Sequence, residues 1–363
     1  MRLDARSFNA SARGDAAAAA ASIAGGSSPH DLPSPAPSIS VRHMSQPPIV
    51  TPHRRFTVLD GGLATELAAR GHDLSDPLWS ARVLIDAPEA IEGVHADYFE
   101  AGADVAITAS YQADYESFAA RGIGAEETTQ LLQRSVTLAR AARDRVLAQH
   151  PGMERALLVA ASVGPYGATR HDGSEYHGNY GLTEDELVAF HRQRVAVLVS
   201  AGPDLLACET LPSLLEARAL VRVLREHPST RAWISFTCRD GLHTSAGDLI
   251  TDCARLLDVE PQVVAMGVNC VAPEHVGSLV RTFVSVSRKP IVAYPNSGEL
   301  WNAISRDWEG VAGHFTTMVP QWLQDGASWL GGCCRTTPAD IRQVRGAVDA
   351  FAHATSPGPI PTR

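Results

Sequence analysis

One pattern repeats along most of this chain and limits the folds that it can adopt. From Phe56 onward, a short apolar run ends in a glycine or a polar residue, and an amphipathic stretch follows it. Continuous apolar runs are typical of strands buried on both faces, which occur in parallel sheets with crossover helices. The runs that predict strands are Thr57–Leu59, Asp104–Ala109, Ala156–Val163, Asp204–Cys208, Ala232–Thr237, Val263–Asn269, Pro290–Tyr294 and Ser328–Leu330.

The stretches between these runs show the spacing of amphipathic helices. The clearest helical patterns are Glu126–Gln149, Thr183–Ser200, Ser213–Glu226, Pro273–Val286, His314–Asp325 and Pro338–Phe351. Eight strand and helix units predict a (β/α)8 TIM barrel, an α/β fold, as a single domain over residues 56–352. An open doubly wound sheet is less favoured, because no Gly-x-Gly-x-x-Gly phosphate fingerprint follows the first strand.

The two ends of the chain lack this pattern. Residues 1–55 are rich in alanine, serine and proline and carry few large apolar side chains. Such a segment cannot bury enough surface to offset the entropy of ordering it, so we predict a disordered tail. Its arginines resemble those of an organellar transit peptide, whereas its aspartates and prolines do not, and Met44 is an alternative natural start. For residues 353–363 we predict a flexible C-terminal tail.

The composition argues against some classes of partner. Hydrophobic residues make up 45% of the chain and charged residues 20%, which is typical of globular proteins. The formal net charge of -9 disfavours nucleic acid and anionic membranes, which bind basic surfaces, and no apolar run approaches the roughly 18 residues of a membrane span. Six cysteines without a secretory signal indicate a reducing compartment. We therefore expect a cytoplasmic monomer or small homo-oligomer, or an organellar protein if the tail is a transit peptide.

The predicted barrel also predicts where chemistry takes place. In such barrels the active site is built from residues at the carboxyl ends of the strands. We therefore expect residues that are far apart in the sequence to meet at one rim. The strand ends are Asp60-Gly61-Gly62, Ser110-Tyr111-Gln112, Gly164-Pro165-Tyr166, Glu209-Thr210, Cys238-Arg239-Asp240, Asn269-Cys270, Pro295-Asn296-Ser297 and Cys333-Cys334.

Two adjacent cysteines follow the last predicted strand. Cys333 and Cys334 come after two glycines. Adjacent cysteines close only a small, strained disulfide ring, but they make good soft ligands for zinc. Cys270 follows the sixth strand and belongs to the same rim. Three sulfurs at one rim would leave the fourth tetrahedral position of a zinc ion open, as catalytic zinc sites require.

The other cysteines are expected in the core. Strand alternation points Cys208 toward the helices if Glu209 faces the barrel mouth. Cys253 lies in a helical pattern of leucine and isoleucine residues. Cys238 ends the fifth strand and is a rival ligand, although a single buried cysteine is usually a free thiol.

Several motifs resemble those of one enzyme family. They are Asp60-Gly61-Gly62 with Ala64-Thr65-Glu66-Leu67, Ile107-Thr108-Ala109-Ser110-Tyr111-Gln112, Ser162-Val163-Gly164-Pro165-Tyr166-Gly167, Cys208-Glu209-Thr210-Leu211-Pro212, Gly267-Val268-Asn269-Cys270 and Gly331-Gly332-Cys333-Cys334-Arg335. Between about Val58 and Ala347 the chain resembles the homocysteine S-methyltransferases, above all the short enzymes that use S-methylmethionine or S-adenosylmethionine. The resemblance implies a zinc-dependent (β/α)8 barrel whose ligands match Cys270, Cys333 and Cys334.

The resemblance also implies a reaction. Methyl transfer from a sulfonium donor to the thiolate of L-homocysteine forms methionine, and the donor leaves as a neutral thioether without an acid. A free thiol with a pKa of about 8.5 is a weak nucleophile at neutral pH, whereas a thiol on Zn²⁺ loses its proton. We therefore expect no catalytic side chain, because the protein positions the substrates and excludes water.

The rim must also hold the amino acid part of homocysteine. The resemblance places Asp60 and Glu209 at the ammonium group of homocysteine. The N–H groups of Gly61 and Gly62 are candidates for binding its carboxylate at a helix start. Both carboxyl side chains have alternative roles, because Asp60 can cap a turn and Glu209 can face a helix N-terminus.

Three more residues and a loop complete the predicted site. Thr108 and Tyr111 are candidates for the pocket wall, and Asn269 is a candidate for ordering the cysteine loop or contacting substrate. Residues 172–180, rich in glycine and tyrosine, are long enough to form a lid after the third strand. The residues do not determine the donor. A betaine-type homocysteine methyltransferase and a non-catalytic zinc or thiol barrel remain as alternatives. A homocysteine module of a cobalamin-dependent synthase is disfavoured, because we expect 363 residues to leave no room for folate and cobalamin domains.

Overall fold

The computed structural model describes residues 56–73, 80–302, 307–309 and 315–355. The chain divides into two units, residues 1–46 and residues 47–363, and every described residue belongs to the second. The predicted N-terminal tail, Met44 and residues 356–363 lie outside the described residues. The last helix, α11 (Pro338–Thr355), is longer than predicted and includes residues 353–355, because the Thr355 hydroxyl donates to the Phe351 carbonyl 2.9 Å away and closes a further turn.

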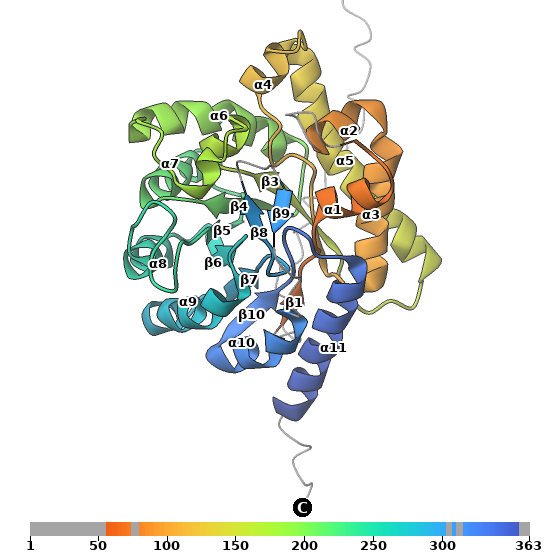
Figure 1. The fold of residues 1–363 in the computed structure, drawn as a ribbon. Helices are drawn as coiled ribbons and strands as arrows, with labels where there is room; N and C mark the ends of the chain where they lie inside the picture. Colours follow the sequence, from red (N-terminus) through yellow and green to blue (C-terminus); the bar gives the residue numbers. More distant parts are fainter. Residues whose placement is uncertain (1–55, 74–79, 303–306, 310–314, 356–363) are drawn as a thin grey trace, which may run out of the picture. The chain divides into compact units, whose positions relative to one another are not determined.

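Eight parallel strands form a barrel (Figure 1). Their order is β1-β10-β7-β6-β5-β4-β3-β2, and a parallel bridge between Leu59 and Val105 joins β1 to β2. The predicted (β/α)8 barrel is confirmed. The strands are β1 (Thr57–Val58), β2 (Val105–Ile107), β3 (Leu158–Val163), β4 (Leu205–Leu211), β5 (Ala232–Phe236), β6 (Val263–Asn269), β7 (Ile291–Tyr294) and β10 (Ala327–Leu330).

The helices surround these strands (Figure 1), and two of them begin at side-chain caps where the predicted helical patterns start. Thr183 and Ser213 accept hydrogen bonds from the N–H groups of Glu186 and Glu216, which fixes the starts of α6 and α7. Together with α11, the helices are α1 (Leu63–Ala69), α2 (Ser80–Asp86), α3 (Pro88–Ala101), α4 (Tyr115–Ala119), α5 (Ala125–Gln149), α6 (Glu184–Ser200), α7 (Leu214–Arg225), α8 (Ile250–Asp258), α9 (Pro273–Val286) and α10 (Val319–Asp325).

Two differences from the predicted elements lie between β7 and β10. Strands β8 (Leu300–Asn302) and β9 (Asp307–Glu309) form an antiparallel pair that the apolar pattern did not predict. The helix predicted over His314–Asp325 begins as a 3-10 turn at Phe315–Met318 and becomes α-helical only at α10. His314 itself lies outside the described residues.

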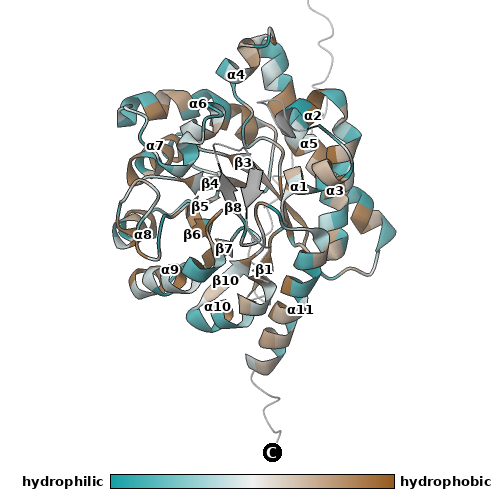
Figure 2. Ribbon diagram, viewed as in Figure 1, coloured by the Kyte–Doolittle hydropathy of each residue, from teal (hydrophilic) through white to brown (hydrophobic). Residues whose placement is uncertain are grey.

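Side chains fill the interior of the barrel and the layer between strands and helices. In Figure 2 the surrounding helices carry both hydrophobic and hydrophilic residues, as expected of helices with one buried face. Inside the barrel, the Trp233 indole N–H donates to the Tyr294 hydroxyl at 2.9 Å, and the rings of Trp233 and Trp329 pack with centroids 5.9 Å apart. Because this interior is packed, chemistry is confined to the rim. Among the described helices, none has the length and apolar character required to cross a membrane.

Candidate active site

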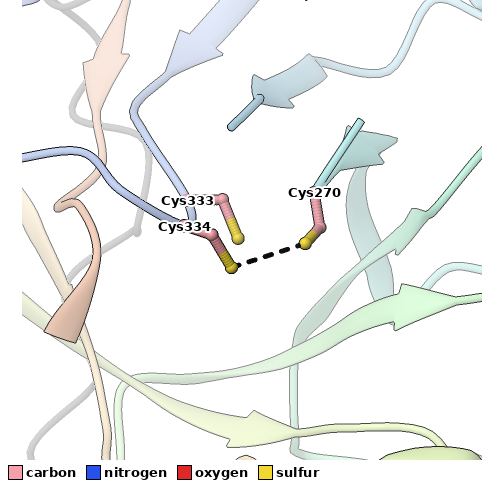
Figure 3. Close-up of side chains that lie close together, drawn as sticks. All are labelled: Cys270, Cys333 and Cys334. Atoms are coloured by element: carbon pink, nitrogen blue, oxygen red, sulfur yellow. Dashed lines mark hydrogen bonds between the residues drawn. The ribbon is translucent and has the colours of Figure 1, made fainter. Parts of the chain in front are cut away.

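Three cysteine sulfurs lie together at the carboxyl ends of β6 and β10 (Figure 3). The Sγ atoms of Cys270, Cys333 and Cys334 are all within 4.8 Å of one another, and those of Cys270 and Cys334 are 3.7 Å apart. Zinc–sulfur bonds of about 2.3 Å in a tetrahedron place two sulfurs about 3.8 Å apart. The cluster therefore fits a tetrahedral thiolate metal, and it is the only such group of possible ligands found among the described residues.

The backbone at Cys270 is held in an uncommon conformation. Its φ of 52° is in the left-handed region, as are those of Thr210 at 59° and Arg335 at 63°. A residue with a Cβ pays about 1 kcal/mol or more for this conformation, so the surroundings must fix it. The Cys270 N–H donates to the Tyr294 carbonyl at 3.1 Å, which continues the pairing of β6 with β7 past the end of the strand.

Glycine is required where β10 leads into the adjacent cysteines. A Cβ on Gly331 would lie 2.7 Å from the Cβ of Leu59 and 2.8 Å from the carbonyl oxygen of Asp60, so only glycine fits there without a shift. Two residues later, the Cys333 N–H donates to the Pro295 carbonyl at 2.8 Å. The close approach of β10 to β1 and of its loop to β7 therefore aims both sulfurs at Cys270.

An ion pair connects the two loops that follow β7 and β10. The Arg335 guanidinium donates to both carboxylate oxygens of Glu299, at 3.0 and 3.1 Å. Ser297 donates its hydroxyl to Glu299 at 2.9 Å and its N–H to the Cys334 carbonyl at 3.1 Å. These contacts hold the cysteine loop against the β7 loop, and the sequence did not predict them.

Two asparagine side chains orient the cysteines. Asn296 accepts a hydrogen bond from the Cys334 N–H at 3.2 Å. Asn269 accepts from the Thr210 N–H at 2.7 Å and the Ser235 hydroxyl at 2.8 Å, and it donates to the Thr210 hydroxyl at 2.7 Å and to Cys333 Sγ at 3.9 Å. Asn269 is fully buried, and its amide joins β4 and β5 to the cysteine loop.

The three thiols do not share their protons equally. Hydrogen bonds from Cys333 and Cys334, with smaller contributions from Tyr176 and Asn296, hold the pKa of Cys270 well below the usual range of a thiol. The same contacts with Cys270 raise the pKa of Cys333 and of Cys334, because a second thiolate would form beside the first. Three thiolates can therefore coexist only with a cation between them.

Two carboxyl groups are buried at the rim: Asp60 follows the end of β1, and Glu209 lies within β4. Asp60 accepts from the Ile107 N–H at 2.7 Å through Oδ2, while its buried Oδ1 has no partner among the described residues. Glu209 accepts from the hydroxyls of Ser162 and Tyr294, the latter at 3.1 Å. Desolvation raises the pKa of Asp60, with a further contribution from Glu209, and raises the pKa of Glu209 to about 7. Both groups would be more stable as carboxylates beside a cation.

Strand β4 runs further than predicted, and it points Glu209 and the preceding Cys208 to opposite sides of the sheet. The strand continues to Leu211, with a register shift between Cys208 and Leu211 where Thr210 adopts its positive φ. Cys208 belongs to the core between strands and helices, as the alternation indicated, while Glu209 bonds across the inside of the barrel. The predicted strand end at Cys208 was too early, because the bulge keeps β4 paired with β5 beyond that residue.

The remaining cysteines are core residues. Cys253 and Cys238 are buried among apolar side chains of the outer core, and neither belongs to the three-sulfur cluster. Burial is the main cause that raises the pKa of each thiol, so both are poorly suited to form thiolates.

Two predicted contact residues are already engaged in the protein. The Gly62 N–H donates to the carbonyl and the hydroxyl oxygen of Thr336 at 3.2 and 3.1 Å. Thr108 is buried, and its hydroxyl contacts that of Ser110 at 2.8 Å and accepts from the Ser162 N–H at 3.1 Å. These atoms therefore join neighbouring segments of the protein, and direct substrate contact by Gly62 and Thr108 stays a prediction.

Aromatic residues approach the cluster from two loops. The Tyr176 hydroxyl lies 3.5 Å from Cys270 Sγ and comes from the 3-10 turn Ser174–Tyr176 of the predicted lid segment. Tyr111 follows β2 and is half-buried; burial raises the pKa of its hydroxyl, and Glu175 and Cys270 raise it further. The sequence pointed to the lid segment but not to Tyr176, since no periodic pattern indicates which loop side chain turns inward.

The fold and the site together define a class of protein: a (β/α)8 barrel with a three-thiol, metal-type cluster at the carboxyl ends of its strands. Residues 57–348 match the family model described as homocysteine S-methyltransferase. The chain therefore belongs to the homocysteine S-methyltransferase family, and it is a methyltransferase.

Individual relatives cover nearly all of the barrel. A homocysteine S-methyltransferase of Escherichia coli is 50% identical over 291 residues, which are 79% of this chain and 94% of that protein. Homocysteine S-methyltransferase YbgG of Bacillus subtilis is 48% identical over 291 residues, which are 79% of this chain and 92% of that one. The crystal structure of the homocysteine methyltransferase MmuM from Escherichia coli, in its metallated form, is 48% identical, with a TM-score of 0.75 over 81% of this chain and 96% of that one.

Proposed function

We propose that this chain uses zinc to transfer a methyl group from a sulfonium donor, S-methylmethionine or S-adenosylmethionine, to the sulfur of L-homocysteine. The observation that carries the proposal is the meeting of three cysteine sulfurs, within 4.8 Å of one another, with two buried carboxyl groups at one rim. A substrate that carries both a thiol and an ammonium group has the chemistry that these two sets of groups require.

Cys270, Cys333 and Cys334 are the proposed zinc ligands. Soft sulfur donors favour zinc over magnesium or calcium, and the 3.7 Å between two of the sulfurs supports a tetrahedral ion. When bound, zinc would supply an open position at which a substrate thiol loses its proton. Asn269 and Asn296 hold the ligand loops in place through the hydrogen bonds described above.

Asp60 and Glu209 are the proposed partners of the homocysteine ammonium group. The partnerless Oδ1 of Asp60 is an acceptor in need of a donor, and a cation would return both carboxyl groups to their ionised forms. Of the two glycine amides, that of Gly61 is the proposed partner of the substrate carboxylate. Tyr111 is the proposed wall of the pocket, while Gly62, Thr108 and Asn269 position the loops.

The transfer itself needs alignment more than acid or base chemistry. As the new sulfur–carbon bond forms, the donor's sulfur–carbon bond breaks, its electron pair stays on the donor sulfur, and a neutral thioether leaves. The chain's residues therefore have to align three atoms and keep water away. Tyr176, with its hydroxyl 3.5 Å from Cys270 Sγ, is placed to cover the cluster.

The free thiols also bear on the cell compartment. All six cysteines are free thiols, and three of them are needed for the metal. A reducing compartment preserves such thiols, so we propose a cytoplasmic location, with the protein acting as a monomer or a small homo-oligomer.

Incubation of the zinc-loaded protein with L-homocysteine and one donor at a time tests this function. The donors are S-methylmethionine, S-adenosylmethionine and betaine, and methionine is measured by chromatography. We expect methionine from at least one sulfonium donor at a rate well above that from betaine. Methionine from betaine alone would overturn the sulfonium proposal, and the absence of methionine from all three would overturn the homocysteine methyltransferase activity.

A further inference from the structure

The lid segment carries a half-buried glutamate, with one fully buried carboxyl oxygen, directly before the tyrosine that contacts the cluster. Glu175 and Tyr176 belong to the 3-10 turn Ser174–Tyr176, and the Tyr176 hydroxyl is 3.5 Å from Cys270 Sγ. The turn is fixed at its start, where the Ser174 N–H donates to the Asp172 carboxylate at 3.0 Å. Glu175 is therefore held next to the cysteine cluster.

Close packing under the turn leaves Glu175 little freedom of position. A Cβ on Gly167 would overlap the backbone of Ser174 and Glu175 and would lie 2.7 Å from the Tyr180 hydroxyl. Gly178, at a φ of 67°, brings the end of the segment against Pro212 in the loop after β4. The segment thus packs against the barrel on both sides of Glu175, and its carboxyl group is set by the fold.

One oxygen of the Glu175 carboxyl group lacks a partner among the described residues. This atom, Oε2, is buried. Desolvation raises the pKa of Glu175 to about 7, and the Cys270 sulfur contributes in the same direction. In turn, Glu175 raises the pKa of the Tyr111 hydroxyl and of the Cys334 thiol, so its charge reaches both loops around the cluster. A carboxylate with a buried, unpartnered oxygen in this setting is stabilised by a nearby cation.

The other cationic parts of the reaction already have partners. The metal belongs to the three cysteines, and the homocysteine ammonium belongs to Asp60 and Glu209, which are borne by the barrel strands. The methyl donor brings a further positive charge, fixed on its sulfur, to a position from which its methyl group can meet the homocysteine sulfur. Glu175 comes from the loop that covers the cluster rather than from the strands beneath it.

We propose that the Glu175 carboxylate recognises the positively charged sulfur of the methyl donor, with Tyr111 and Tyr176 as the aromatic neighbours of that sulfur. This inference rests on the proposed function. During transfer the donor sulfur keeps the electron pair of the broken bond and becomes neutral, while the homocysteine sulfur gains the methyl group and its thiol proton has gone to solvent. The attraction to Glu175 therefore ends with the reaction, which assists release of the thioether.

This charge pair has a kinetic signature. Because the donor's charge decreases as the methyl group departs, Glu175 stabilises the bound donor at least as much as the transition state. Its loss should raise the KM for the donor without lowering kcat, and it should leave the KM for homocysteine unchanged. A merely structural role of the lid would instead lower kcat and affect both substrates.

The Glu175→Gln variant tests the proposal, because the amide has the same shape and no charge. We expect the KM for S-methylmethionine to rise at least tenfold, with the KM for homocysteine within twofold of the unsubstituted protein. Calorimetric titration with S-methylmethionine and with methionine, which lacks only the methyl group and its charge, gives a second readout. The dissociation constant of methionine divided by that of S-methylmethionine should fall at least tenfold in this variant, toward 1. Glu154→Gln, at an exposed position before β3, is the matched control and should leave this ratio unchanged.

The outcomes separate this inference from the proposed function. An unchanged affinity ratio in Glu175→Gln, or a rise in the KM for homocysteine instead of the donor, would overturn the role of Glu175 while methionine is still formed. No methionine from the unsubstituted protein would overturn the function itself. The melting temperature of Glu175→Gln should equal or exceed that of the unsubstituted protein, since the charge of a carboxylate with a buried, unpartnered oxygen is removed; a lower value would indicate a structural role and count against the proposal.

Discussion

The interior of the barrel and its rim are built from the same strands, but they differ in how completely their buried polar atoms are hydrogen-bonded. Inside, the Tyr294 hydroxyl accepts from Trp233 at 2.9 Å and contacts the Ser235 hydroxyl at 2.8 Å, so the buried polar atoms satisfy one another. At the rim, oxygens of Asp60 and Glu175 are buried without partners among the described residues, and Cys270 has a positive φ. At the rim, features that cost folding free energy thus lie where ligands are expected to bind.

The cysteines repeat this contrast. Burial raises the pKa of Cys208 to about 12 and that of Cys238 well above the usual range, and neither thiol belongs to the three-sulfur cluster. Cys270, which is equally buried, has its pKa lowered because neighbouring thiols donate to it. Burial alone therefore makes a cysteine inert, whereas burial together with sulfur neighbours prepares it for a metal.

The largest predicted effect breaks the cluster. Cys270→Ser replaces a soft thiolate by a hydroxyl, and we expect zinc affinity and methionine formation to fall by more than the roughly 100-fold seen when only an outer partner of a ligand is lost. Cys238→Ser is the matched control, because it changes a buried thiol outside the cluster. This variant should keep one zinc per chain. Metal content after dialysis and the rate with homocysteine and S-methylmethionine measure both. Equal zinc retention in the two variants would contradict the ligand assignment.

The contrast also explains how much of the molecule the sequence predicts. Strand β6 and helix α9 have the predicted bounds, because an apolar run ends at Asn269 and a proline occupies the first turn at Pro273. Strand counting likewise brought Cys270 to the rim of Cys333 and Cys334. These features depend on local patterns, which a single sequence displays.

The features that sequence reasoning missed depend on contacts between distant segments. The Gly62 amide is used by Thr336, and Tyr176 reaches Cys270 from a loop whose shape depends on packing against Gly167. No periodicity encodes such contacts, and the same is true of the bulge at Thr210. The sequence indicated which types of residue lie at the rim. The fold was needed to show which of their atoms remain available for ligands.

A buried polar group in the helical layer sharpens the comparison, because it lies outside the rim. His95 on α3 is fully buried, and neither ring nitrogen has a partner among the described residues. Desolvation lowers the pKa of His95 from 6.5 to about 4. Between these values the unfolded chain binds a proton that the folded chain excludes, so the free energy of unfolding decreases as the pH falls through this window. The full loss below pH 4 is roughly 3 kcal/mol.

We therefore predict that His95→Leu is more stable than the unsubstituted protein by an amount that grows as the pH falls. The additional gain from pH 8 to pH 5 should be about 2 kcal/mol. Denaturant titrations at both pH values measure it. The comparison must be made between the two proteins, because Glu209, whose pKa is raised to about 7, shifts stability in the opposite direction in both. A gain that is the same at pH 8 and pH 5 would mean that His95 keeps its proton in the fold.

The smallest predicted effect distinguishes the two asparagines at the cluster. The Asn296 side chain accepts a hydrogen bond from the Cys334 N–H and donates toward Cys270, so these contacts link it to the ligand loops. Asn296→Ala should reduce zinc affinity by about tenfold, the lower end of the range for such partners, and change the free energy of unfolding of the metal-free protein little. Asn269→Ala should also reduce the free energy of unfolding, because it leaves the Thr210 N–H and the Ser235 hydroxyl inside the barrel without their acceptor.

Zinc competition with a chelator and denaturant titration of the metal-free protein separate the two variants. If Asn296→Ala destabilised the metal-free chain as much as Asn269→Ala, the rim would be part of the packed core and not a separate, ligand-directed layer. If it lost zinc affinity alone, the boundary between core and rim would lie between β6, where Asn269 bonds into the barrel, and the loop after β7, where Asn296 bonds to the cysteine loop. We expect the second result, because the polar groups of Trp233, Ser235 and Tyr294 inside the barrel are satisfied without Asn296.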